Sequence, residues 1–244
     1  MNFEEWLGTA TKSNGQFLAP RTVKHYVDGL KITSQEMYAH GVINKKLEDM
    51  HLYELDLAIA IIMKNKLFLD KDETGNKMYS NALKRFRCFK YLNTDLGIQE
   101  EAQVAAITND NSLTQTEKET IIKARVGQGK YRELLMKKYN RTCIMTDVNI
   151  PQVLIASHIK PWAVCDNFER TDVNNGLILS ATYDRLFDSG LITFSKNGKI
   201  KISRLINKDN ALKLNINSNQ IYDIKYNPLM DDYLDYHNQF IFVD

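Results

Sequence analysis

The stretch "VLIASHIKPW", residues 153–162, decides the fold of this chain. A run of strand-forming apolar residues leads directly into His158, and Pro161 then ends the strand. A surface loop accepts almost any residue in such a place, so a histidine that closes a strand raises the question of what holds it there. A lone histidine at a strand end is most often structural, and its function therefore depends on the residues that follow.

A second stretch, "NNGLILSATYDRLFDSG", residues 174–190, has apolar residues at helical spacing and ends in Ser189–Gly190, as helices commonly do. Asp184 and Asp188 are four residues apart, which places them on the same helix face. Two carboxylates beside a histidine are ligands that a hard cation such as Mg²⁺ prefers. Other roles stay open, because Asp184 can cap the helix or pair with Arg185, and Asp188 can bind the amides of the following turn.

These stretches, with the "ER" of residues 169–170 between them, resemble the HNH nucleases. The motifs "ASHI.PW", "ER", "NGL.LS" and "D.LFD.GLI.F" occur in the order of a bacterial restriction-endonuclease-like branch of that family, and the resemblance covers residues 122–244. It implies an α+β fold, in which an N-terminal helical domain precedes a ββα-metal (HNH) nuclease domain with an added β-hairpin and a C-terminal helix.

The resemblance also implies a role for each residue of the site. His158 would be the general base, since a neutral imidazole has a pKa close to the working range of an enzyme near neutral pH. Asn175 would hydrogen-bond the backbone across the loop and so hold the imidazole in place. Asp184 and Asp188 would bind a metal ion, which acts as a Lewis acid on the phosphate.

The chain departs from the family pattern at several points. Many members have an acid or a second histidine immediately before the base, where this chain has Ser157, and the helix position usually filled by histidine is Asp184. An oxygen ligand there favours Mg²⁺ or Mn²⁺ over Zn²⁺. The paired zinc-binding cysteines of small relatives are missing, so no structural zinc is expected. Apolar packing of the hairpin after Gly190 and of the C-terminal helix would replace it.

Hydrophobic spacing predicts the elements around the site. Helices are expected at residues 3–11, 19–39, 47–65, 75–92, 115–126 and 131–139. Two short strands around a turn are expected within residues 142–159, and a hairpin around Asn197–Gly198. A closing helix within residues 227–243 should direct Leu229, Tyr233 and Tyr236 to the core. The predicted domains are a helical DNA-recognition or accessory domain (1–96), an acidic polar linker (97–120) and the nuclease domain (121–244).

Composition limits the compartment. The three cysteines among 244 residues are widely spaced, which excludes a disulfide framework and favours free thiols in a reducing compartment. No apolar run reaches the ~20 residues that span a bilayer, and the first residues lack the pattern of a signal peptide. We expect a cytoplasmic protein with no membrane partner.

Positive charge is concentrated between residues 123 and 141, although the net charge is only +2. Such a block is typical of a solvated helix face and equally of a patch that contacts phosphates, so both interpretations stay open. On the second interpretation the DNA-binding residues are Lys123, Arg125, Lys130, Arg132, Lys137, Lys138, Arg141 and Lys160. The partner would be double-stranded DNA, with a homodimer favoured for a palindromic target.

The sequence therefore predicts a metal-dependent DNA endonuclease, of the type II restriction kind, that leaves 5′-phosphate and 3′-hydroxyl ends. Two alternatives are kept. One is a non-catalytic DNA-binding protein on a degenerate HNH fold, which has lost its metal site because Ser157 replaces a metal ligand. The other is an endonuclease directed at modified DNA.

Overall fold

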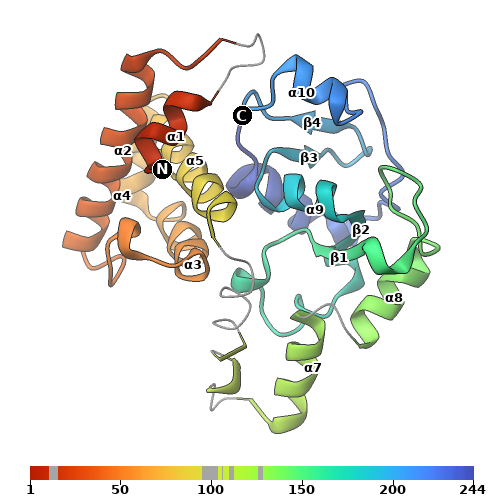
Figure 1. Ribbon diagram of the computed structural model, residues 1–244. Coiled ribbons are helices and arrows are strands. Elements are labelled where there is room, and N and C mark those ends of the chain that lie inside the picture. The colour runs from red at the N-terminus through yellow and green to blue at the C-terminus, as the bar shows by residue number, and fades with distance from the viewer. Residues whose placement is uncertain (11–15, 95–103, 106, 110–112, 126–128) are drawn as a thin grey trace.

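The computed structural model describes residues 1–10, 16–94, 104–105, 107–109, 113–125 and 129–244. They form a helical part and a part that mixes helices with two small sheets, and the two parts lie side by side (Figure 1). The predicted α+β class is confirmed. Within the described ranges, no helix has the length and apolar character needed to cross a membrane.

The helical part has its own hydrophobic core. Its helices are α1 (Phe3–Thr9), α2 (Pro20–Ala39), α3 (Leu52–Ile62), α4 (Lys66–Thr74) and α5 (Met78–Leu92). Pro20 opens α2, where its missing N–H costs nothing, and the Asn65 side chain caps α4. The fully buried Leu55 and Leu83 belong to a core that draws on all five helices.

The second part contains the histidine and its neighbours. Its elements are α7 (Gln115–Arg125), α8 (Lys130–Lys138), β1 (Leu154–His158), β2 (Gly176–Ser180), α9 (Ala181–Asp188), β3 (Ile192–Phe194), β4 (Ile200–Ile202), α10 (Lys208–Lys213), α11 (Asp231–Tyr236) and a π-helical turn (His237–Ile241). A second core, separate from the first, fills the space between its strands and α8, α9 and α11.

The strand pairing differs from the prediction for residues 142–159. Only the second predicted strand exists there, as β1, and its antiparallel partner is β2, which we had assigned to the start of a helix. The residues Leu177–Leu179 of β2 are all apolar and buried on both faces, and such a run has no alternation that separates strand from helix. In the predicted first strand, Ile144 lies in a turn and donates its N–H to the carbonyl of Ile178, 3.0 Å away.

The C-terminal half contains the predicted hairpin, in which β3 pairs with β4. The closing helix is shorter than expected, since Pro228–Met230 is a 3₁₀ turn that precedes α11. The assignment of Leu229 to the core was wrong, because this side chain is 70% exposed and Met230 is buried instead. Tyr233, also assigned to the core, is buried on α11.

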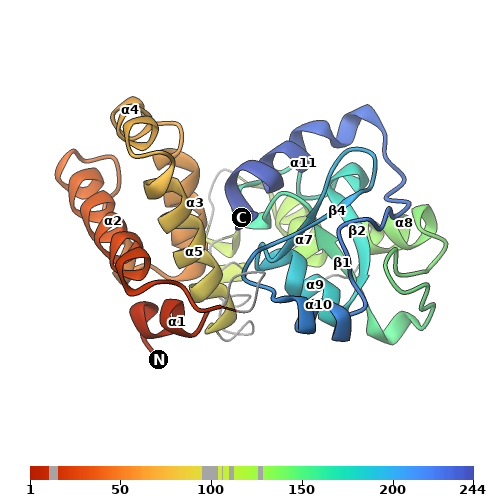
Figure 2. The same ribbon diagram turned by 90° about the horizontal axis from the view of Figure 1, so that it is seen from above.

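Helix α5 lies on the side of the helical part that faces the second part (Figures 1 and 2). Its residue Arg85 donates a hydrogen bond to the backbone carbonyl of Asp244, and Arg87 donates one to the backbone carbonyl of Asp188. Of the predicted linker, residues 97–103, 106 and 110–112 lie outside the described residues, and α7 begins at Gln115 within its last part.

Candidate active site

His158 ends β1 and its ring is held on two sides. Its Nε2 lies 3.0 Å from the carbonyl oxygen of Arg170, and the ring stacks on Tyr131 of α8 with 4.6 Å between centroids. A carbonyl oxygen only accepts hydrogen bonds, so Nε2 must carry the hydrogen. In the neutral ring the lone pair is then on Nδ1, which is the atom that can accept a proton.

Asn175 closes the loop between β1 and β2. Its side chain is fully buried, and its Oδ1 accepts a hydrogen bond from the backbone N–H of Lys160 at 2.8 Å. Its Nδ2 donates to the carbonyl of Glu169 at 3.0 Å and to the sulfur of Cys165 at 3.2 Å. One amide group thus joins the two ends of the loop, and both hydrogens of its Nδ2 are engaged within the protein.

The loop that carries the Arg170 carbonyl is itself cross-braced. Asp166 and Glu169 exchange hydrogen bonds between side chain and backbone, and Lys160 donates to both oxygens of Glu169 at 2.6 and 2.5 Å. The guanidinium of Arg170 stacks on Trp162 at 4.1 Å. These contacts fix the carbonyl that orients His158, so the imidazole is positioned before any substrate arrives.

Asp184 and Asp188 lie one turn apart on α9, and both are half-buried. The Asp188 carboxylate accepts hydrogen bonds from the Tyr91 hydroxyl at 3.2 Å and from the Ser157 hydroxyl at 3.4 Å. Burial raises the pKa of the Tyr91 phenol, and the negative charges of Asp188 and Asp184 raise it further. Asp188 therefore lies on the side of α9 that faces α5, and Asp184, four residues before it, shares that helix face.

Neighbouring residues of β1 face opposite ways, as in any strand. Ser157 is buried toward α9, where it meets Asp188, whereas His158 lies against Tyr131 of α8. The imidazole of His158 and the carboxylate that Ser157 contacts thus lie on opposite faces of β1, at its last two residues.

The donor set decides which ion the site could hold. Within the described ranges, no three side chains of the His, Cys, Asp and Glu types gather as metal ligands. A closed zinc site of four protein ligands is therefore not what these residues offer. Asp184 and Asp188 with water and a substrate phosphate suit Mg²⁺, which is usually bound through one or two carboxylates.

The predicted DNA-binding residues fall into two groups. Four side chains are exposed, namely Lys123, Lys130, Lys137 and Arg141. Three others bind protein groups: Arg132 the carbonyl of Pro151, Lys138 the carbonyl of Val173, and Lys160 the carboxylate of Glu169. Burial lowers the pKa of Lys138 as well. The side chain of Arg125 lies outside the described residues.

Sequence reasoning missed three residues of this region. Tyr131 stacks on His158 and donates to the carbonyl of Asn175, and Tyr91 and Arg87 of α5 bind Asp188. Of the three, only Tyr131 had a feature in the sequence that could have indicated a role, namely an aromatic ring within a basic helix. Tyr91 and Arg87 carry no local mark of a contact with a residue about a hundred positions away.

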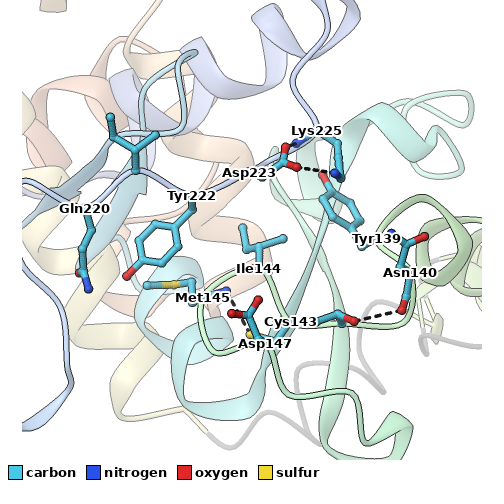
Figure 3. Close-up of a pocket in the computed structure, with 12 residues that line it drawn as sticks. Tyr139, Asn140, Cys143, Ile144, Met145, Asp147, Gln220, Tyr222, Asp223 and Lys225 are labelled. Atoms are coloured by element: carbon cyan, nitrogen blue, oxygen red, sulfur yellow. Dashed lines mark hydrogen bonds and ion pairs between the residues drawn. The ribbon is translucent and has the colours of Figure 1, made fainter.

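A cavity of about 550 Å³ lies elsewhere, between residues 139–147 and 220–225 (Figure 3). Figure 3 shows Tyr139, Tyr222 and Asp147 around it, with Asp223 paired to Lys225 at its rim. None of the predicted catalytic or metal-binding residues lines it. It is therefore separate from the histidine site.

Comparisons with known proteins bear on the same segment. Residues 143–195 match a family model described as HNH endonuclease. The match contains His158, Asn175, Asp184 and Asp188. No curated protein matches the chain.

Proposed function

Because residues 143–195 form an HNH endonuclease domain, which hydrolyses phosphodiester bonds in nucleic acid, we propose that the chain is a metal-dependent DNA endonuclease of the restriction type. The observation that carries this proposal is the positioning of His158, whose Nε2 is bound to the Arg170 carbonyl while its ring rests on Tyr131. Nδ1 is thereby assigned as the proton acceptor.

The imidazole acts on a water molecule. Nδ1 of His158 takes a proton from the water, whose oxygen attacks phosphorus. The bond from phosphorus to the 3′ oxygen breaks, and that oxygen takes up a proton from solvent. The products are a 5′-phosphate and a 3′-hydroxyl end. Asn175 holds the loop that orients the base, and Tyr131 keeps the ring plane fixed.

HNH nucleases generally use divalent metal ions, and Mg²⁺ or Mn²⁺ fits the oxygen donors of this chain. Asp184 and Asp188 would hold it. A bound ion supplies charge stabilisation at the phosphate and at the departing oxygen.

The exposed basic residues would contact DNA. Lys123, Lys130, Lys137 and Arg141 would lie along the phosphate backbone, where each neutralised phosphate adds affinity that falls with salt. The helical domain, residues 1–96, would recognise double-stranded DNA, and a homodimer would place two sites on a palindromic target. The nuclease domain would span residues 121–244.

The proposal is tested by cleavage of plasmid DNA with Mg²⁺ or Mn²⁺. Wild type should cut, His158→Ala should lose at least about a hundredfold in rate, and the matched control His25→Ala, an exposed histidine of α2, should keep it. Equal absence of cutting in wild type and His158→Ala would instead support a non-catalytic DNA-binding protein. Cleavage rates on methylated and unmethylated plasmids distinguish an enzyme that requires modified DNA from one that does not.

A second comparison concerns the metal assignment. Asp184→Ala should abolish metal-dependent cutting while DNA retention in a gel shift stays near the wild-type level. Retained cutting would remove Asp184 from the ligands. Sequencing of the cut ends gives both the recognised bases and the expected end chemistry.

A further inference from the structure

The end of α9 meets the helical part of the chain at a candidate metal ligand. The hydroxyl of Tyr91, on α5, donates to Oδ2 of Asp188 at 3.2 Å, and the hydroxyl of Ser157, on β1, donates to Oδ1 at 3.4 Å. Two donors from different elements hold the two oxygens of one carboxylate. Its rotation is therefore set partly by a residue outside the nuclease segment.

The backbone of the same residue is held by the same helix. Arg87 donates through Nη1 to the carbonyl of Asp188 at 2.7 Å, and a cation at the C-terminal end of a helix is favourable. The guanidinium is buried and pairs with Asp56 of α3, with 2.6 Å between Nε and Oδ1. Since Arg87 and Tyr91 are four residues apart, one face of α5 binds both the main chain and the side chain of Asp188.

Tyr91 in turn has little freedom. Its side chain is 5% exposed, and the guanidinium of Arg185, on α9, lies over its ring at 4.6 Å. Arg185 also donates to the carbonyls of Tyr91 and Leu92, at 3.1 and 3.3 Å. The ring is clamped between the two helices with its hydroxyl directed at the carboxylate.

We propose that Tyr91 is a positioning residue, through which the helical part orients Asp188 for the metal ion. This inference rests on the proposed function, because it takes Asp188 as a ligand. Ligating carboxylates are usually hydrogen-bonded by a second layer of residues, whose loss costs about 10-fold to 100-fold in metal affinity or activity. The nuclease domain would then depend on α5 for its metal affinity as well as for its stability.

Tyr91→Phe tests the idea, since it keeps the ring under Arg185 and removes only the hydroxyl. In titration calorimetry of the DNA-free protein with Mn²⁺, its affinity should fall about tenfold. The Mn²⁺ concentration for half-maximal cleavage should rise by the same factor. Tyr79→Phe removes a hydroxyl from the same helix away from Asp188 and should leave both values unchanged. Unchanged Mn²⁺ affinity and an unchanged cleavage curve in Tyr91→Phe would overturn the inference.

A double-mutant cycle separates positioning from a general structural effect. Asp188→Asn keeps the shape of the side chain and weakens it as a ligand. In that background Tyr91→Phe should cause no further loss of Mn²⁺ affinity, because it acts through the carboxylate. An equal loss in both backgrounds would show a structural role alone. If wild type neither binds Mn²⁺ nor cuts, the proposed function fails together with the inference; if wild type cuts and the two affinities are equal, only the inference fails.

Discussion

Replacing Asn175 by alanine should lower both stability and cutting, since this amide joins the two ends of the loop between β1 and β2. The change removes the acceptor of the Lys160 N–H and the donor to the Glu169 carbonyl, at 2.8 and 3.0 Å. An unsatisfied buried polar group costs about 1–3 kcal/mol, so two partly buried ones amount to about 3 kcal/mol. In a chain of this length the melting temperature falls by about 9 °C.

Urea unfolding followed by tryptophan fluorescence measures the loss, since Trp162 lies within this loop and stacks with Arg170. The matched control is Asn174→Ala, whose amide binds the Asp172 and Asn227 side chains and not the loop backbone. It should lose about 1 kcal/mol. Plasmid cutting, assayed at a temperature where both variants are folded, should fall at least tenfold in Asn175→Ala and little in the control. Equal stability of the two variants, or a full cutting rate in Asn175→Ala, would refute the assignment of Asn175 as the loop clamp.

Three further changes test the framework around the site. Asp56→Ala should destabilise the protein by about 3–5 kcal/mol in urea unfolding, because it leaves Arg87 buried and unpaired, whereas Asp56→Leu combined with Arg87→Met should cost less than either removal alone. Gly190→Ala should cost about 3 kcal/mol in the same assay, since Gly190 has φ +79° and a Cβ would lie 2.2 Å from the carbonyl oxygen of Ile241. Burial lowers the pKa of His237 to about 3, so below about pH 6.5 the unfolded chain binds a proton that the folded chain does not. The free energy of unfolding should therefore decrease as the pH falls below about 6.5, by about 2 kcal/mol at pH 5. His237→Gln should remove most of this decrease when urea unfolding is measured against pH.

The sequence predicts those contacts of the site that join residues close together in the chain, and it does not predict those that join distant residues. His158 and Asn175 are 17 positions apart in one motif, and the loop between them explains their spacing. The contacts of Asp188 with Tyr91 and Arg87 join elements 97 and 101 positions apart. They arise from the packing of two separate cores, and neither charge nor periodicity within α5 marks them in advance.

The same limit applies to the secondary structure and to the charges. Leu177, Ile178 and Leu179 are apolar without a break, so the sequence of β2 has no alternation that marks a strand. Its pairing with β1 makes it one. The sequence does not distinguish the basic residues between 123 and 141 that are exposed from those that bind protein groups. Lys137 is exposed while Lys138 beside it binds the Val173 carbonyl, a difference that the end of α8 and its neighbours impose.

Ser157 departs from the family pattern, and the structure shows what stands in place of an acid there. Its hydroxyl is buried and donates to Asp188, so a carboxylate at this position would face another carboxylate across about the same distance. At an effective dielectric constant of about 20, two charges about 4 Å apart repel by about 4 kcal/mol. The serine therefore avoids a repulsion that a bound cation would otherwise have to offset.

Restoring the acid with Ser157→Asp makes this argument measurable. In EDTA the variant should be destabilised by about 3 kcal/mol, close to the repulsion above and discounted for partial exposure of Asp188. Mn²⁺ should recover much of that loss, because the ion would then have an additional carboxylate ligand. Thermal melts with EDTA and with Mn²⁺ give both values, and Ser157→Asn, of equal size and without the charge, should show no such recovery. A Ser157→Asp protein that Mn²⁺ does not stabilise more than wild type would place the metal ion away from the end of β1, and Asp188 would lose its assignment as a ligand.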